Sequence, residues 1–393
     1  MKQNSLPVRP DLETLRQQAM ALGEGDLALA QLAIAESYGA PSWQRLELSC
    51  RLIDAIWRDD LEQLVALIHA HPSLLHENAG IGNGNWGPPL TYAANLGRDR
   101  LIAALHSLGA TDLSTGFERA LLQGKLETAR MLHRLAGATL PSTDILGGPA
   151  YSLNAEGTAL AFELGATLPL VEGKPHAPVD VVLETDARKP EAKHAILEMY
   201  ARHGFEFPDT PMMALHRGRR DLLEQHLERD PALLHRTFRY DEIYPPELSC
   251  HEEWLPRTTL AGATLLHVCV EYDELELARW LLDRGMPVDV PAATDAAGFG
   301  GQTALFHAVV GFPNFWNNLH GVEGNPAFTR LLLERGASPN ARASLLERLF
   351  VDQRPTGFRE HREVTPLEWG SAYHNPLIVN RVAMALIATR RAS

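Results

Sequence analysis

The chain has 393 residues, of which 45% are hydrophobic and 22% charged, a composition typical of an ordinary water-soluble protein. Its formal net charge of −13 argues against a nucleic-acid backbone or an anionic membrane surface as the main partner, although it permits a local basic patch. No run approaches 18 consecutive apolar residues, so we expect no membrane span. The first seven residues, Met1 to Pro7, lack the apolar core of a signal peptide.

Cysteine usage indicates a reducing compartment. The chain contains three cysteines, Cys50, Cys250 and Cys269, and no Cys-x-x-Cys pair. A disulfide framework or a zinc–thiolate site is therefore not expected. We expect a cytoplasmic protein.

The N-terminal residues 1–46 predict a short helical module. Apolar residues recur at helical spacing over Leu12–Leu22 and again over Leu27–Ile34, with two glycines between the two runs. The module ends in Tyr38-Gly-Ala-Pro-Ser-Trp43. We expect it to cap the apolar end of the segment that follows.

The next segment, residues 47–235, contains weak repeats. Helix pairs are predicted over Leu52–Leu75, Val179–Gly204 and Met212–Leu234, with Gly-Ala ends at 109–110, 137–138 and 165–166. The sequence His-Pro-Ser-Leu-Leu-His at 71–76 is echoed by Asp-Pro-Ala-Leu-Leu-His at 230–235. This internal similarity indicates a repeated architecture.

The C-terminal segment, residues 236–393, carries the clearest repeats. Thr264-Leu-Leu-His267 is followed by a second helical run that ends at Gly285, and Thr303-Ala-Leu305 by a run that ends at Gly336. A third start occurs at Thr365-Pro-Leu-Glu-Trp369. The threonine of each start can cap the free amides of a helix, and the glycines fall where positive φ can end one.

These residues resemble the ankyrin repeat, in which a T-x-L-H helix start precedes a leucine-rich second helix and a Gly-Ala-x-x-Asn turn. The leader before them resembles that of many bacterial ankyrin proteins. The resemblance implies an all-α solenoid of about nine helix pairs over 47–393, with long irregular loops in the C-terminal half. In such repeats the imidazole at the His267 position ties neighbouring loops together.

Four stretches exceed a minimal repeat and are expected to carry the function. They are residues 77–87, 236–260, the pair 291–301 and 311–326, and 351–364. Gly336 follows Gly285 by 51 residues, against about 33 in an ankyrin repeat. The stretches combine aromatic residues with carboxylates, imidazoles and amides, a mixture that suits a concave pocket and differs from that of a disordered linker.

The candidate residues come from these stretches. Ligand-binding candidates are the aromatic and polar residues Trp86, Tyr240, Tyr244, His251, Trp254, Phe315, Trp316, Asn317, His320 and Arg359. Catalytic candidates are the acids Asp241, Glu242 and Glu252, because a paired-carboxylate mechanism needs two acids facing each other across a substrate. The alternative is that single aromatic residues anchor the loops and that the acids are solvated charges.

Ankyrin families mostly mediate protein recognition, so we expect a binding protein that contacts a protein partner through its concave face and extended loops. The alternative is an enzyme, a hydrolase or lyase acting on a small polar or carbohydrate substrate, and a third hypothesis is a small-molecule sensor. No recurrent metal-ligand spacing, nucleophile signature or phosphate loop occurs, so we expect no metal and no cofactor.

Overall fold

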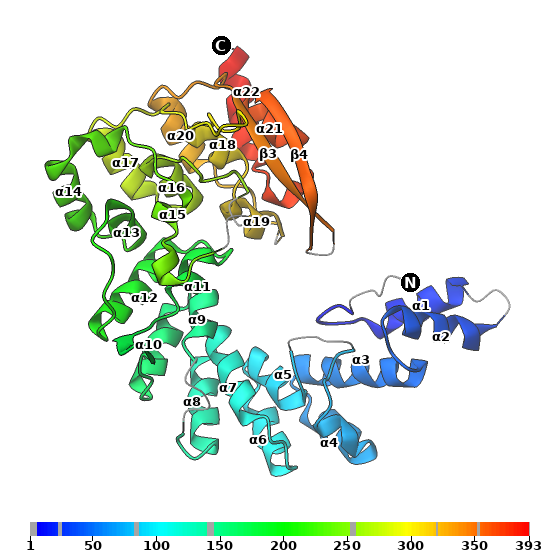
Figure 1. The fold of residues 1–393 in the computed structure, drawn as a ribbon. Helices are drawn as coiled ribbons and strands as arrows, with labels where there is room; N and C mark the ends of the chain where they lie inside the picture. The colour runs from blue at the N-terminus through cyan, green and yellow to red at the C-terminus, as the bar shows by residue number, and fades with distance from the viewer. Residues whose placement is uncertain are drawn as a thin grey trace. The chain divides into compact units, whose positions relative to one another are not determined.

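The computed structural model describes residues 6–22, 26–81, 86–139, 145–251, 257–319, 321–351 and 354–392. The chain forms two compact units, residues 1–167 (unit 1) and 168–393 (unit 2), and the boundary falls inside the weak-repeat segment 47–235 of the predicted array 47–393. Each unit is built mostly of short helices (Figure 1). No helix in these ranges is long and apolar enough to cross a membrane.

Unit 1 is a row of antiparallel helix pairs. Neighbouring pairs meet through α3, α5 and α7 on one side and through α4 and α6 on the other. Polar caps fix the starts: the Ser42 hydroxyl accepts the Arg45 amide, and the Asp60 carboxylate accepts the Gln63 amide. The elements are α1 Leu12–Leu22, α2 Leu27–Ser37, α3 Trp43–Trp57, α4 Leu61–Ala70, η1 Pro72–Leu75, α5 Pro89–Leu96, α6 Asp99–Ser107, α7 Leu113–Leu122, α8 Leu126–Leu135, α9 Gly147–Tyr151 and α10 Ala155–Glu163.

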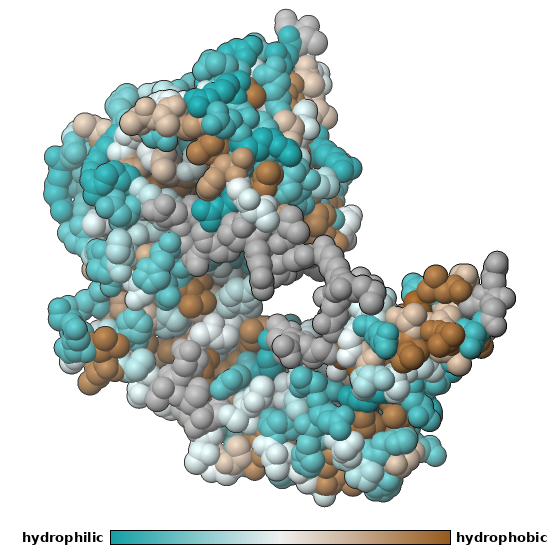
Figure 2. Space-filling view, turned by 45° about the vertical axis from the view of Figure 1, so that its right-hand side comes forward, coloured by the Kyte–Doolittle hydropathy of each residue, from teal (hydrophilic) through white to brown (hydrophobic). Residues whose placement is uncertain are grey.

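The N-terminal helices α1 and α2 share a small core with α3. Leu15 and Ala19 of α1 and Ile34 of α2 are buried against Leu46 and Cys50 of α3. The other sides of α1 and α2 expose the apolar side chains of Met20, Leu22, Leu27, Leu29 and Leu32. Figure 2 shows hydrophobic surface, in brown, over the N-terminal helices.

Unit 2 contains the repeats that the sequence analysis singled out. Helix α16 packs on α13 and α18, α18 packs on α21, and α20 packs on α17 and α22. The elements are β1 Leu170–Val171, β2 Lys174–Pro175, α11 Val179–Glu184, α12 Pro190–Arg202, α13 Pro211–His216, α14 Arg220–Arg229, η2 Pro231–Leu234, α15 Tyr240–Ile243, η3 Pro246–Leu248, α16 Leu265–Glu271, α17 Leu275–Asp283, α18 Ala304–Val309, α19 Phe312–Leu319, α20 Ala327–Glu334, β3 Ala343–Val351, β4 Arg354–Val364, α21 Pro366–Ala372, η4 Pro376–Ile378 and α22 Arg381–Ala392.

The Thr264 motif folds as its sequence predicts. The backbone amide and hydroxyl of Thr264 both donate to His267 Nδ1, at 3.2 and 2.8 Å, so the opposite nitrogen Nε2 carries the proton and donates to the Gln302 carbonyl at 2.9 Å. Burial lowers the pKa of His267 to about 3 and keeps the ring neutral. His267 thus links the start of α16 to the residue that precedes Thr303 at the start of α18.

The segment 351–364, predicted to be an irregular loop, is instead part of a long β-hairpin. Strands β3 and β4 pair antiparallel, with Leu345 opposite His361 and Glu347 opposite Arg359. Unit 2 therefore departs here from the all-α fold expected from the sequence. The hairpin lies between α20 and the Thr365 helix start (Figure 1).

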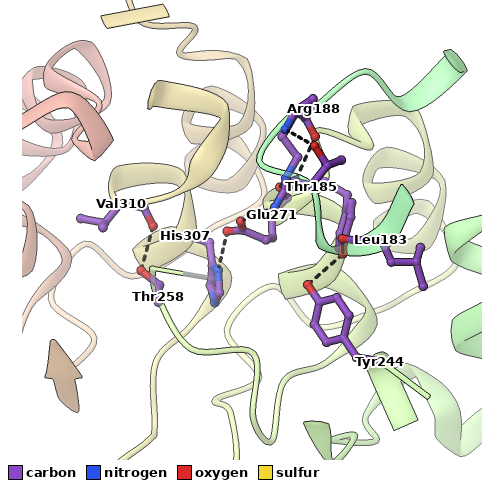
Figure 3. Close-up of polar contacts among 10 residues, drawn as sticks. Leu183, Thr185, Arg188, Tyr244, Thr258, Glu271, His307 and Val310 are labelled. Carbon is purple, nitrogen blue, oxygen red and sulfur yellow. Dashed lines mark hydrogen bonds and ion pairs between the residues drawn. The ribbon is translucent and has the colours of Figure 1, made fainter. Parts of the chain in front are cut away.

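A buried polar network holds the middle of unit 2 together (Figure 3). The fully buried Glu271 carboxylate accepts from Arg188 Nη2 at 3.1 Å and lies 3.5 Å from His307 Nδ1. Arg188 Nε also donates to the Glu271 carbonyl at 2.7 Å. The Thr258 hydroxyl donates to the Val310 carbonyl at 2.8 Å. The network joins the segment before α12 to α16 and α18.

Asp273, in the turn after α16, gives this region a pH dependence. Burial, with the nearby carboxylates of Glu274 and Glu191, raises the pKa of Asp273 to about 6. Unfolded chains ionise Asp near pH 4, so the stability that the protonated side chain contributes is present below about pH 4 and is lost as pH rises to 6. Asp273→Asn should remove this loss and raise the free energy of unfolding at pH 7 by about 1–2 kcal/mol.

The measurement is urea unfolding of both proteins between pH 4 and 7, followed by pulsed hydrogen exchange of peptides from α16, which reports on unit 2 separately from unit 1. The φ of +60° at Asp273 is compatible with Asn, so the substitution adds no backbone strain. Parallel pH profiles of the wild type and the variant would contradict the prediction.

Candidate functional site

A cavity of about 530 Å³ opens in unit 2 beside the β-hairpin. We call it the hairpin pocket. Its walls come from residues 237–240, 257–262, 293–300 and 344–348, with Phe358 and Tyr373. Three of the predicted long stretches, 236–260, 291–301 and 351–364, therefore contribute to one cavity.

One wall is the loop 291–301 between α17 and α18, which we call the finger. The Asp295 carboxylate accepts the backbone amides of Ala297 and Phe299 at 2.9 and 2.8 Å and so closes a tight turn. Gly300 has a φ of +130°, and a Cβ there would collide with the Ala293 carbonyl. Only glycine fits this position.

A β-bridge joins the finger to the hairpin. The Gly300 amide donates to the Ser344 carbonyl at 2.7 Å, and the Ser344 amide donates to the Gly300 carbonyl at 3.0 Å. On the opposite wall, Phe238 pairs with Ala263, with its amide 2.8 Å from the Ala263 carbonyl. These backbone contacts give the pocket walls that are fixed before any partner binds.

The pocket contains a half-buried cation, Arg257. Its guanidinium lies against the rings of Phe312 and Phe350, 5.1 and 4.7 Å from their centroids. Its Nε atom is buried, and the described residues give that atom no hydrogen-bond partner and the guanidinium no carboxylate at ion-pair distance. Burial lowers the pKa of Arg257, and the nearby charge of Arg348 acts in the same direction.

The charge balance of the lining is positive. Arg239, Arg257 and Arg348 line the pocket, and Asp295 is the acid found among the described lining residues. The Asp295 carboxylate is exposed and engaged by backbone amides, while Arg239 pairs with Asp241 at 2.9 Å. The site is therefore suited to a group that carries negative charge and apolar surface.

The two described catalytic candidates lie on α15. Asp241 is half exposed and paired with Arg239. Glu242 pairs with Arg236 and caps α15 by accepting the Arg239 amide at 2.8 Å. The third candidate, Glu252, lies outside the described residues.

The binding candidates are dispersed. Tyr240 lines the hairpin pocket, and Tyr244 stacks on it with ring centroids 4.8 Å apart. Tyr244 is buried and shares a 2.8 Å hydrogen bond with Tyr272, whose hydroxyl donates to the Leu183 carbonyl at 2.6 Å. Tyr244 is thus part of the core. His251 is exposed and donates its amide to the Glu184 carboxylate at 2.6 Å.

The remaining candidates lie away from the pocket lining or outside the described residues. Trp86 belongs to unit 1, where it packs on Trp57 and Tyr92. Phe315 is a half-buried residue of α19, and Arg359 on β4 lies 3.4 Å from the buried Glu347 carboxylate. Trp254 and His320 lie outside the described residues, as do the side chains of Trp316 and Asn317.

Sequence reasoning missed the residues that define the pocket chemistry. Arg257 lies in the predicted stretch 236–260, whose predicted site residues were acids, aromatic residues and His251. Phe299, Arg348 and Phe358 come from the finger and the hairpin. An arginine among apolar residues was the available signal, and the pairing of the hairpin was needed to place it.

In the described parts of the chain, no three His, Cys, Asp or Glu side chains gather as a metal site would require. The nearest arrangement is the Glu347 carboxylate, which accepts from His361 Nε2 at 2.8 Å and lies 2.5 Å from His374 Nδ1. These bonds tie β3 to β4 and to the end of α21.

A comparison with protein families identifies one ankyrin repeat in the chain. Residues 261–295 match the family model of the ankyrin repeat. The chain thus carries an ankyrin repeat at the Thr264 motif, which confirms the prediction from its sequence, and such repeats are generally protein-interaction modules. The chain is also similar to the crystal structure of the human ASB11 ankyrin repeat domain, with 15% identity, coverage of 76% of this chain and 97% of that one, and a TM-score of 0.27. A similarity of this extent says nothing about partner or activity. A comparison with curated proteins gives no match.

Proposed function

We propose that this chain is a binding protein that recognises a protein partner and takes an extended segment of that partner into the hairpin pocket. The observation that carries the proposal is the pocket itself, walled by the ankyrin finger 291–301 and the lengthened hairpin. Ankyrin proteins place their interaction surfaces on the fingers and the concave face. In this chain, the β3–β4 hairpin would extend that surface beyond the finger.

The backbone of β3 supports an extended partner. Ser344 exchanges both of its backbone hydrogen bonds with Gly300, so the backbone of Leu346, two residues later, faces the same side. Among the described residues, β3 pairs with β4 along one edge. At its other edge, β3 meets the finger at the Gly300–Ser344 bridge. A partner segment in the pocket can add backbone hydrogen bonds there, a common mode of peptide recognition.

Two aromatic side chains, the half-buried Phe299 and the exposed Phe358, supply the contact area. Phe299, on the finger, and Phe358, which is 59% exposed on β4, both line the pocket. Arg362 lies over the Phe299 ring, 3.7 Å from its centroid, and keeps the ring in place. Aromatic residues held in this way dominate the binding energy of many interfaces.

The test is selection of random twelve-residue peptides displayed on phage against the full chain, followed by affinity measurement of the selected peptides by fluorescence polarisation. Phe299→Ala and Phe358→Ala should each weaken binding about tenfold. Leu170→Ala, a matched change at an exposed apolar residue of β1 outside the pocket lining, should leave it unchanged. Peptides that bind all four proteins equally would refute the pocket as the binding site.

The enzyme hypothesis has less support from the described residues. Asp241 and Glu242 are each held by an arginine, and Asp241 lies outside the pocket lining.

For the cellular location of the protein, we infer the reducing cytoplasm, supported by the three free, buried cysteines. Fluorescence microscopy of a tagged full chain in its source cell would test that inference, and an extracellular signal would contradict it.

A further inference from the structure

We propose that the hairpin pocket pairs a carboxylate of the bound partner, from an aspartate or glutamate side chain, with the guanidinium of Arg257. This inference rests on the proposed function and adds the chemistry of the group that is recognised. It makes an acidic residue flanked by apolar residues the core of the recognised segment.

The orientation of Arg257 prepares it for a carboxylate. The rings of Phe312 and Phe350 hold the guanidinium, and the Nε hydrogen lacks a protein acceptor among the described residues. Because the Nε atom is buried, the contact falls to the two terminal Nη groups, which present their own fork to the two oxygens of a carboxylate.

Within the described residues, the surrounding charges leave this cation incompletely balanced. Glu271 and Asp186 act on Arg257 from a distance, but the Glu271 carboxylate is already bound to Arg188. Arg348, on β3, adds a second positive charge to the same pocket. An incoming anion is therefore attracted, and the half-buried position of Arg257 strengthens that attraction compared with an exposed site.

The pocket also has room for what flanks the carboxylate. Tyr240, Phe299 and Phe358 form apolar walls around the arginine. A volume of about 530 Å³ is in the range of sites that hold a few residues or a small molecule. An isolated inorganic anion would leave these walls without contact, whereas a side-chain carboxylate within a peptide would cover them.

The experiment uses the phage-selected peptides and the full chain. We expect the peptides to share an acidic residue, and Arg257→Gln to weaken their binding roughly 30-fold. Replacing the acidic residue of the peptide by its amide should weaken binding to the wild type by a similar factor. Arg257→Gln tested with the amide peptide should bind less than about threefold more weakly than either single change, because the two changes remove the same interaction.

Controls separate charge, geometry and folding. Arg257→Lys keeps the positive charge but loses the forked geometry of the guanidinium. Its peptide affinity should lie between those of the wild type and Arg257→Gln. Arg381→Gln removes an exposed arginine at the start of α22, outside the pocket lining, and should bind as wild type does. Circular dichroism and thermal unfolding of each variant show whether it is folded.

The outcomes are distinct. Peptides that lose affinity with Phe299→Ala but carry no acid and bind Arg257→Gln normally would overturn the carboxylate inference and leave the proposed function standing. Peptides insensitive to all pocket variants would remove both. Displacement of peptide by millimolar inorganic phosphate, but not by acetate at equal ionic strength, would assign the site to phosphate and overturn the carboxylate.

Discussion

Replacing Glu271 by alanine is expected to lower the free energy of unfolding of unit 2 by about 3–5 kcal/mol. Glu271 is fully buried, and its partner Arg188 is 3% exposed, so the variant leaves a guanidinium in the interior without its carboxylate. Removing one member of a buried pair is costlier than removing both, because the remaining charge has lost both water and its partner. Arg188→Met together with Glu271→Leu should therefore recover part of the loss.

Hydrogen exchange of peptides from α16 and α18 is the suitable measurement, because the chain has two compact units and a single melting curve mixes them. The matched control is Asp283→Ala, which breaks an ion pair with Arg335 whose side chains are 58% and 32% exposed. Exposed pairs contribute about 0–1 kcal/mol. Similar losses of unfolding free energy in Glu271→Ala and Asp283→Ala would contradict the stabilising role given to the buried Arg188–Glu271 pair.

Trp369→Ala is expected to destabilise unit 2 by about 3–5 kcal/mol, the range for truncating a large buried aromatic side chain. Trp369 is fully buried on α21, donates its Nε1 hydrogen to the Thr258 hydroxyl at 3.0 Å, and meets His361 and Tyr373 edge-on. The cavity left behind would separate α21 from the hairpin and from the segment that carries Arg257. Peptide affinity should fall together with stability.

Trp369→Phe is the informative control, because it keeps most of the ring volume and loses the hydrogen bond to Thr258. It should cost about 1–2 kcal/mol and retain peptide binding. Urea unfolding followed by hydrogen exchange of the hairpin peptides measures both variants. An alanine variant within about 1 kcal/mol of the wild type would show that Trp369 does not hold the hairpin.

The repeat could be predicted because its signals are local. Thr264 and His267 lie within one helical turn, and each contact they make follows from their positions in the motif. The glycine after each second helix is equally local: Gly285 and Gly336 both have a φ of +91°. Residue type and spacing were sufficient for these elements.

The hairpin and the pocket could not be predicted in this way. The pairing of β3 with β4 depends on register shifts near Ser344 and Phe350, which no short motif encodes. Arg257 gains its character from Phe312 and Phe350, residues far from it in the sequence. The pairing of Arg188 with Glu271, 83 residues apart in the sequence, likewise arises only in the folded chain. Such sites depend on residues that become neighbours only in the tertiary structure, and patterns in a single sequence do not predict those contacts.

The burial of all three cysteines turns the thiols into built-in reporters of opening. Cys50 lies in unit 1, and Cys250 and Cys269 lie in unit 2. Burial raises the pKa of Cys50 to about 12 and raises that of the other two as well, so the reactive thiolate is scarce in the folded chain. Alkylation by a maleimide should therefore be slow until a unit opens. The labelled position then identifies which unit opened, without any engineered probe.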